Sequence, residues 1–295
     1  MLIAFKFKIA LACAAGLAAP LTVAPLVSDF SARSPALASE QAMVEVHPSS
    51  LSYRVAGDFT RHGKPAEAPR LSLRLAHKLS IMQHQVSAAD YQACVDDGGC
   101  RALARGVVVA EDRPAVQVSW HDADGYAAWL SRRTGEIYRL PTDEEWAFAA
   151  GAKFRDDGIA VDDTDPAKRW LAKYERESDG HADDTEAHRF GRFGVNEHGL
   201  LDLAGNVWEW TSTCFTRSVL DDEGRTTATN SNCGVRVAEG AHRAYVTDFI
   251  RDARAGGCAA GVPPNNLGFR LVREPRSLLL SLSSRLARAL STARS

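Results

Sequence analysis

Gly205-Asn206-Val207-Trp208-Glu209-Trp210-Thr211 is the stretch of this 295-residue chain that says most about its fold. Its tryptophans and β-branched residues predict a short strand over residues 207–211. Two further patterns accompany it, Tyr138-Arg139-Leu140-Pro141-Thr142-Asp143-Glu144-Glu145-Trp146 upstream and Leu267-Gly268-Phe269-Arg270 downstream. Each pattern is weak alone, but the three in this order carry the identity of the fold.

Three helices are predicted from their N-terminal caps. Ser87-Ala88-Ala89-Asp90 has capping-box spacing, with Asp in place of the usual Glu, so a helix begins at Ser87 and ends near residues 97–98. Ser119 heads a second helix, in which apolar residues recur at helical spacing until Gly135 ends it. Thr142-Asp143-Glu144-Glu145 is a full capping box, which predicts a third helix over residues 143–150.

The remaining strand signals are short, over residues 72–75, 116–118, 236–238 and 269–272, so much irregular backbone is expected. Residues 153–189 are dense in charges of both signs and poor in large apolar side chains, which is typical of a long surface loop or insertion. Their aspartate pairs lack the alternating spacing of a calcium loop, so a solvated face is favoured there.

The two ends of the chain differ in composition from its body. A lysine-containing start, an apolar run and the small residues of Pro35-Ala36-Leu37-Ala38 predict a signal peptide over residues 1–38, with a membrane anchor as the alternative. A domain is then expected over residues 39–274. Residues 275–295 form a basic tail with leucines on one helical stripe. A basic amphipathic tail of this kind could bind a membrane or a partner surface. The favoured alternatives are that it packs on its own domain or is disordered.

The composition of the chain limits the kinds of partner that it is expected to bind. Removing residues 1–38 takes three of the 35 basic and one of the 37 acidic residues, which leaves a formal charge of −4. A mildly acidic body argues against nucleic acid as a partner. The predicted location is the periplasm or the outside of the cell, an oxidising compartment.

Five cysteines remain after the signal, an odd number. Cys94 and Cys100 flank two glycines that let the chain fold back, so a local disulfide is predicted between them. The other three, Cys214, Cys233 and Cys258, have an order but no known distances. Because no Cys-x-x-Cys spacing is present, a structural zinc site is not expected.

Together with Val118-Ser119-Trp120, the three patterns resemble the sulfatase-modifying-factor family, whose best-known members are formylglycine-generating enzymes. The resemblance runs from about residue 43 to residue 274. In detail the chain is most similar to the NirV-like branch found beside copper nitrite reductase. The segments that carry this are Ile81-Met82, Gln85-Val86-Ser87-Ala88-Ala89-Asp90-Tyr91, Asn232-Cys233-Gly234-Val235-Arg236-Val237 and Asp248-Phe249-Ile250-Arg251-Asp252-Ala253-Arg254.

The resemblance implies an α+β fold: one C-type-lectin-like sulfatase-modifying-factor domain with low regular secondary structure and bound calcium. By position, Asp202 and Glu209 would supply carboxylates to the calcium, and Gly205 and Val207 backbone carbonyls. Hard oxygen ligands from one loop suit calcium. The alternative is that the two acids only cap or pair locally.

The resemblance also implies copper held by a Cys-x4-Cys pair, and here the sequence departs from it. Counting forward from Arg236 puts Tyr245 and Ile250 at those positions, and counting back from Arg251 puts His242 and Thr247 there. Copper is therefore not expected, since Cu(I) needs soft thiolates. An iron site is not expected either, because His242 is the only histidine in the groove region. Cys214 and Cys233 bracket a polar loop and are predicted to form a second disulfide.

That pairing leaves Cys258 as a free thiol or, in the sharper alternative, a copper or redox contact. No catalytic residue is assigned. Trp208 corresponds to a tryptophan of the family's substrate cleft, and His242 and Tyr245 would lie opposite it, a set suited to gripping an extended peptide. The first hypothesis is an exported binding or maturation factor, with a nitrite reductase as its partner. The alternatives are an oxygen-dependent oxidase of the formylglycine type and a lectin-like module.

Overall fold

The computed structural model describes residues 42–155, 165–179, 186–255, 263–264 and 266–275. The predicted signal peptide, the tail from residue 276 and Cys258 lie outside these residues, so the predictions about them stay predictions. Among the described helices, none combines the length and the apolar character needed to cross a bilayer.

The three predicted helices are confirmed. They are α1 (Ala88–Asp96), α2 (Trp120–Thr134) and α3 (Asp143–Ala150). Their N-caps are Ser87, Ser119 and Thr142, each of which accepts a hydrogen bond from a backbone N–H three residues on. The caps were legible in the sequence because they join residues only three positions apart.

A fourth helix corrects the prediction of a loop over residues 153–189. Following the short η1 (Gly151–Lys153), α4 (Pro166–Asp179) lies within that charged segment. Asp165 Oδ1 accepts a hydrogen bond from Ala167 N (2.9 Å), and Pro166 occupies the first helical position. Proline there is already set to the helical φ angle, so Asp165-Pro166 was the helix-start signal that the charge pattern obscured.

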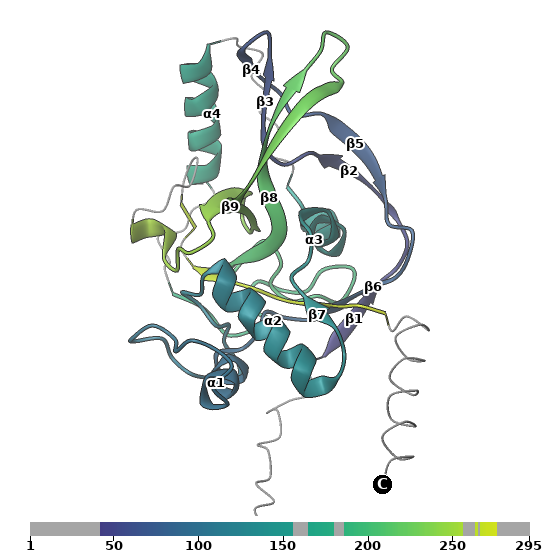
Figure 1. The fold of residues 1–295 in the computed structure, drawn as a ribbon. Coiled ribbons are helices and arrows are strands. Elements are labelled where there is room, and N and C mark those ends of the chain that lie inside the picture. Colours follow the sequence, from purple (N-terminus) through teal and green to yellow (C-terminus); the bar gives the residue numbers. More distant parts are fainter. Residues whose placement is uncertain (1–41, 156–164, 180–185, 256–262, 265, 276–295) are drawn as a thin grey trace, which may run out of the picture. The chain divides into compact units, whose positions relative to one another are not determined.

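Three sheets contain the strands (Figure 1). The first runs β1 (Met43–Val46), β6 (Leu79–Met82), β12 (Val272–Arg273), β7 (Tyr138–Arg139). The second runs β10 (Ala244–Thr247), β9 (Thr226–Glu239), β8 (Trp208–Leu220), β3 (Asp58–Arg61), β4 (Lys64–Ala66), with β11 (Leu267–Gly268) parallel to β8. The third pairs β2 (Ser50–Arg54) with β5 (Arg70–Arg74).

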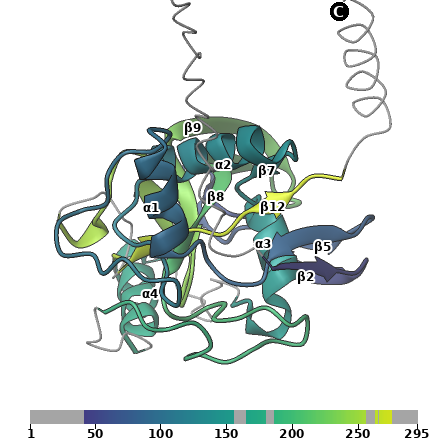
Figure 2. The ribbon, with the colours of Figure 1, turned by 90° about the horizontal axis from the view of Figure 1, so that it is seen from below.

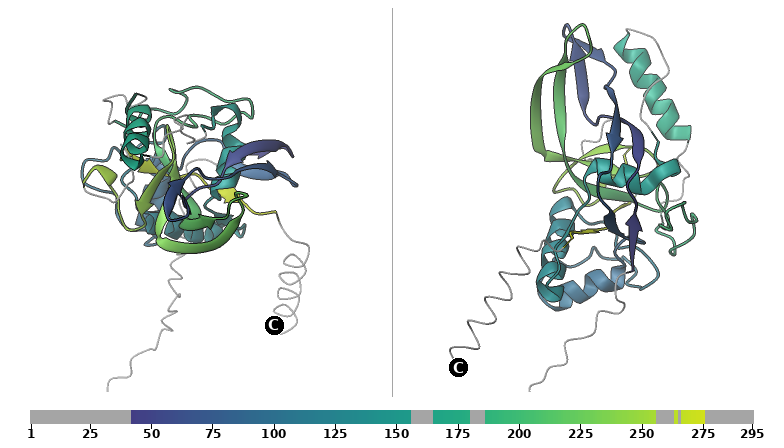
Figure 3. Two further views of the ribbon diagram at one scale, coloured as in Figure 1. Left: turned by 90° about the horizontal axis from the view of Figure 1, so that it is seen from above. Right: turned by 90° about the vertical axis from the view of Figure 1, so that its right-hand side faces the viewer.

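The expectation of short strands is wrong for β8 and β9, which have 13 and 14 residues and form one long antiparallel hairpin. In the right-hand view of Figure 3 these green strands rise at the end away from α1 and α2. The predicted strand over residues 116–118 is absent, because Gln117 adopts a left-handed φ of 56° that breaks an extended chain. The strand expected over residues 269–272 is wrong for residues 269–271, which lie between β11 and β12, and only Val272 is in a strand.

The main core joins α1 and α2 to the start of β8. The two helices cross and contact each other (Figure 2). Tyr126 on α2 stacks on Tyr91 of α1 (5.8 Å) and meets Phe269 edge-on (5.5 Å), and Trp210 of β8 is fully buried in the same cluster. A second core under α3 is built on Trp146. The three sequence patterns thus supply Trp210 and Phe269 to the main core and Trp146 to the second, while α1 and α2 supply Tyr91 and Tyr126.

Candidate functional site

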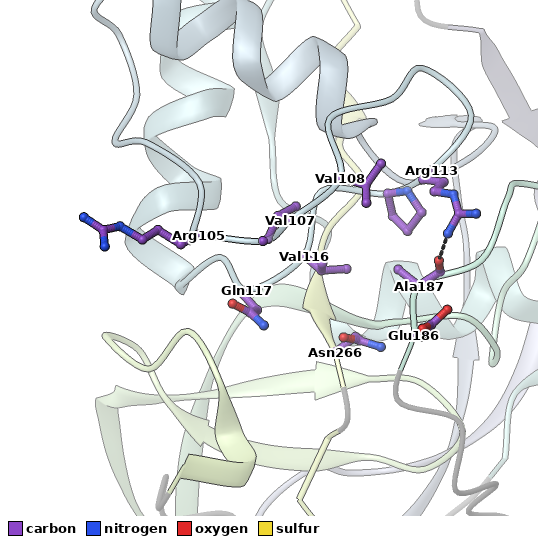
Figure 4. Close-up of a pocket in the computed structure, with 11 residues that line it drawn as sticks. Arg105, Val107, Val108, Arg113, Val116, Gln117, Glu186, Ala187 and Asn266 are labelled. Carbon is purple, nitrogen blue, oxygen red and sulfur yellow. Dashed lines mark hydrogen bonds between the residues drawn. The ribbon is translucent and has the colours of Figure 1, made fainter.

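A pocket of ≈ 300 Å³ opens between four segments that are distant in sequence (Figure 4). The loop after α1, the residues leading into α2, the segment after residue 185 and the residue before β11 line it: Arg105, Gly106, Val107, Val108, Arg113, Pro114, Val116, Gln117, Glu186, Ala187 and Asn266. The sequence analysis did not identify this pocket, because its walls meet only in the folded chain.

The lining combines apolar surface with a few polar groups. Arg113 Nη1 donates to the carbonyl of Ala187 (2.9 Å), which ties the two walls together (Figure 4). Gln117, which lines the pocket, has a positive φ. Non-glycine residues with such strained backbone are often found at functional sites. Val108 is 62% exposed at the rim. A hollow of this size and mixture can accept one side chain and its flanking backbone from an extended peptide.

Trp208 and His242 contact each other outside the lining of the pocket, and a backbone hydrogen bond links Trp208 to it. Asn266, which lines the pocket, accepts a hydrogen bond through its carbonyl from Trp208 N (2.8 Å). Trp208 Nε1 donates to the carbonyl of His242 (2.9 Å), and the two rings meet edge to face at 5.2 Å. The structure therefore brings together two of the three residues predicted to line the groove.

Tyr245 is the third, and it faces the other side of the sheet. Its neighbours Ala244 and Val246 lie in the main core, so strand alternation directs Tyr245 the opposite way. Its hydroxyl accepts a hydrogen bond from Gly57 N (2.7 Å), and its ring packs on Phe215 (5.1 Å). The structure does not bring Tyr245 to Trp208 and His242.

The loop predicted to bind calcium has an unusual backbone. Asp202, Ala204 and Asn206 all have φ between 57° and 59°, three left-handed non-glycine residues within five positions. Asp202 is fully buried, and its carboxylate accepts from Gly191 N (2.7 Å) and Phe193 N (2.8 Å). The carbonyl of Gly205 accepts from Val207 N (2.7 Å). Several of the predicted ligand oxygens are thus engaged within the protein.

The carboxylate of Glu209 accepts more hydrogen bonds than that of Asp202. Its carboxylate takes two hydrogen bonds from the guanidinium of Arg270 (2.6 and 2.7 Å), one from Gln85 (2.7 Å) and one from Trp146 Nε1 (2.9 Å). Arg270 is also fully buried. A guanidinium on both carboxylate oxygens occupies the directions from which a cation would be bound, so in this arrangement Glu209 does not fit a calcium ligand. Calcium at this loop stays a prediction, and no chemistry below depends on it.

The positions predicted for copper ligands hold no thiol. Ile250 packs against the main core, and Thr247 lies at the end of β10. Both predicted disulfides, Cys94–Cys100 and Cys214–Cys233, are confirmed, so every cysteine in the described part of the chain is bonded. Within those residues, no three histidine, cysteine, aspartate or glutamate side chains are grouped so that they could hold a metal ion.

A buried ionic cluster lies where β2, α3 and β9 meet. Arg243 is 1% exposed and pairs with Glu239 (2.7 Å) and Asp143 (3.1 Å), while the Tyr53 hydroxyl donates to Asp143. Burial, with the Asp143 charge beside it, raises the pKa of Glu239 well above its ordinary value. Two acids thus share one guanidinium, and Glu239 holds its proton to a higher pH than an exposed glutamate does. In the sequence, Glu239 and Arg243 are the only members of this cluster that lie close together, four residues apart.

Comparisons with known proteins show which family and which relatives the chain is similar to. Residues 31–275 match the family described as the sulfatase-modifying factor enzyme 1-like domain. A formylglycine-generating enzyme of Mycobacterium tuberculosis is 38% identical over 112 residues, which are 35% of this chain and 34% of that protein. The inactive Cα-formylglycine-generating enzyme 2 of Bos taurus is 32% identical over 177 residues, 52% of this chain and 53% of its own length. The chain thus spans about a third to a half of these relatives.

Among solved structures, that of PvdO from Pseudomonas aeruginosa superposes with a TM-score of 0.50 at 21% identity, covering 79% of this chain and 94% of that one. The likeness concerns the fold alone. It supports one mixed domain of helices and strands, as predicted, while the likeness to C-type lectins stays a prediction.

Proposed function

The chain belongs to the sulfatase-modifying factor enzyme 1-like family, and we propose that within it this protein is an exported peptide- or protein-binding factor without the copper cysteine pair. One observation carries the proposal. Tyr245 and Ile250 stand where forward counting puts the copper ligands, and both side chains are committed to packing, Tyr245 on Phe215 and Ile250 on the core. Neither offers the soft sulfur that Cu(I) prefers.

Two further facts support a binding role. The inactive member of the family from Bos taurus shares 32% identity with this chain over 177 residues, so the family includes a protein named for its lack of this activity. The pocket beside Trp208 presents apolar walls and a few polar groups to an extended segment. The two disulfides are compatible with an extracellular or periplasmic location.

The partner we propose is a copper nitrite reductase or a protein of its assembly, as the resemblance to the NirV-like branch implies. Calcium at the 202–209 loop is part of the same proposal. The run of left-handed residues there supports it, whereas the Glu209–Arg270 pair argues against Glu209 as a ligand.

An oxidase of the formylglycine type is the second candidate. The 38% identity to the enzyme of Mycobacterium tuberculosis favours it, although the match covers 112 residues. On that hypothesis the protein would convert a peptide cysteine with oxygen, and the thiol at Cys258 would be the first residue to test.

One experiment separates the two. The purified mature protein is mixed with a fluorescein-labelled Cys-x-Pro-x-Arg peptide, or with copper nitrite reductase, and binding is read by anisotropy while mass spectrometry follows formylglycine. Saturable binding without conversion is expected. Val108→Asp on the pocket rim should weaken it about tenfold by placing a charge on apolar surface. Val219→Asp, on the exposed hairpin, is the matched control. Catalytic formylglycine formation would overturn the proposal in favour of the oxidase, and absence of binding to both probes would overturn it as well.

A further inference from the structure

The Cys214–Cys233 disulfide lies at the irregular point of the β8–β9 hairpin. Cys214 pairs in register with Arg236, but the next residue, Phe215, pairs with Asn232. Residues 233–235 of β9 are therefore extra and form a bulge that the disulfide closes. Opening this bond disturbs a segment in which the ladder of hydrogen bonds is already interrupted.

The two sulfur atoms have different surroundings. Cys233 is exposed, whereas Cys214 is half-buried. The Sγ atom of Cys214 accepts a hydrogen bond from Arg236 Nη1 (3.1 Å), which also donates to the carbonyl of Ser212 (2.8 Å). A reagent from solvent therefore meets Cys233 first, and Arg236 is at the far sulfur.

The Arg236 guanidinium makes no ion pair within the described residues, although the charges of Asp248 and Asp124 act on it from farther away. It stacks 3.9 Å over the ring of Trp120, whose Nε1 donates to the carbonyl of Thr211 (2.9 Å). Within the described residues no carboxylate lies within 4.0 Å of it, and its Nε is buried with no acceptor. Asp248, the acid of the adjoining turn, pairs with His121 instead (3.1 Å).

Burial lowers the pKa of Arg236, and Asp248 and Asp124 offset this only from beyond ion-pair distance, so an anion closer to the guanidinium would stabilise it. If the disulfide were reduced, the Cys214 thiolate would lie within hydrogen-bond distance of the guanidinium. Basic groups of this kind stabilise thiolates and make the sulfur a good leaving group.

We propose that Cys214–Cys233 is a thiol–disulfide exchange site whose co-reactant is a dithiol. A thiolate of the dithiol attacks Sγ of Cys233, the S–S bond breaks, and its electron pair goes to Sγ of Cys214, which leaves as a thiolate paired with Arg236. The second thiol of the reagent gives its proton to solvent and attacks the mixed disulfide. Cys233 is released and takes a proton from water. The dithiol loses two electrons and becomes a disulfide, and the protein disulfide gains them.

The other disulfide is the internal control. Cys94 is fully buried in the main core and its partner Cys100 is half-buried, and among the described residues no arginine donates a hydrogen bond to either sulfur. A purely structural role for both bonds predicts that the exposure of Cys233 alone sets the rate of opening and that the charge of Arg236 does not change it. An exchange site predicts that Cys214–Cys233 opens in the folded protein.

The first test reduces the folded mature protein with dithiothreitol at pH 7 and traps thiols by alkylation for mass spectrometry. Cys214–Cys233 should open at least about tenfold faster than Cys94–Cys100, with unchanged tryptophan fluorescence. Arg236→Gln should slow the opening about tenfold and Arg236→Lys should restore part of the rate, because the charge matters. Arg217→Gln is the matched control, since Arg217 lies over the Phe215 ring on the same hairpin and does not contact sulfur.

A second test identifies the attacked sulfur. Glutathione, a monothiol, is used to trap the mixed disulfide, which should be found on Cys233. Trapping on Cys214, equal opening rates of the two bonds, an unchanged rate in folded Arg236→Gln, or opening only with unfolding would each overturn the proposal. None of these measurements depends on peptide binding, so they test the exchange site independently of the proposed function.

Discussion

Glu209→Gln removes one charge from the buried pair that joins two of the sequence patterns. The guanidinium of Arg270 is fully buried and makes two of its hydrogen bonds to Glu209. The others go to three backbone carbonyls, those of Met82, Gln83 and Leu201. The glutamine keeps the shape of the side chain but leaves Arg270 as an uncompensated buried cation.

Breaking one side of a buried ion pair costs about 3–5 kcal/mol. For a domain of this size, 1 kcal/mol lowers Tm by about 2–4 °C, so Glu209→Gln should lower Tm by about 6–20 °C. Arg270→Met should be destabilising too, because it leaves the buried Glu209 charge without its cation and three backbone carbonyls without their donor. In the double variant no charge remains unpaired, so its loss should be smaller than the sum by about 2 kcal/mol.

Differential scanning calorimetry of the four proteins measures this cycle. Glu45→Gln is the matched control, because Glu45 pairs with Lys78 at 2.7 Å but both side chains are more than half exposed. Its Tm should equal that of the wild type. If Glu209→Gln melts within about 2 °C of the wild type, or if the two single effects simply add, then Arg270 and Glu209 do not form the energetic link inferred here.

Three further outcomes follow from the same structure. Because burial raises the pKa of Glu239, the folded state holds a proton that the unfolded state releases, so the unfolding free energy should fall as pH rises above 4.5. Glu239→Gln should flatten that decline in urea titrations between pH 5 and pH 9, and an unchanged slope would contradict it. Gly240→Ala puts a methyl 2.7 Å from the ring of Trp208, so about 1–3 kcal/mol of stability should be lost and tryptophan emission should shift. EGTA should lower Tm if calcium binds at the 202–209 loop, and an unchanged Tm with added calcium would refute that prediction.

The helices show why some features were readable in advance. Ser87, Ser119 and Thr142 each cap a helix through a hydrogen bond to a residue three positions on, and Cys94 and Cys100 close a loop of a few residues. In such short separations the local backbone brings the partners together, whatever the rest of the chain does. The three sequence patterns indicated the family, and the family implied the mixed fold.

The site depended on long-range contacts, and there the predictions were less complete. Tyr245 and Trp208 were placed together by position in the family, yet strand alternation turns Tyr245 to the other face of the sheet. The pocket was missed because its lining comes from segments as far apart as Arg105 and Asn266. The length of β9 was missed because its exposed half, residues 226–234, is mostly polar, so no alternating apolar pattern marks it or its pairing with β8.

The sequence by itself determined the family, the three capped helices and the Cys94–Cys100 pair, since each depends on residue type, order and short separations, whereas the structure decided that Cys214 pairs with Cys233. Only the tertiary structure decided which groups face one another: Arg270 with Glu209 across 61 residues, Arg243 with Asp143 and Glu239, and Arg236 with the sulfur of Cys214. A buried charge must find a partner to offset the loss of its hydration, but many acids in the chain satisfy that need equally well. The choice among them is made by the packing that brings one within reach.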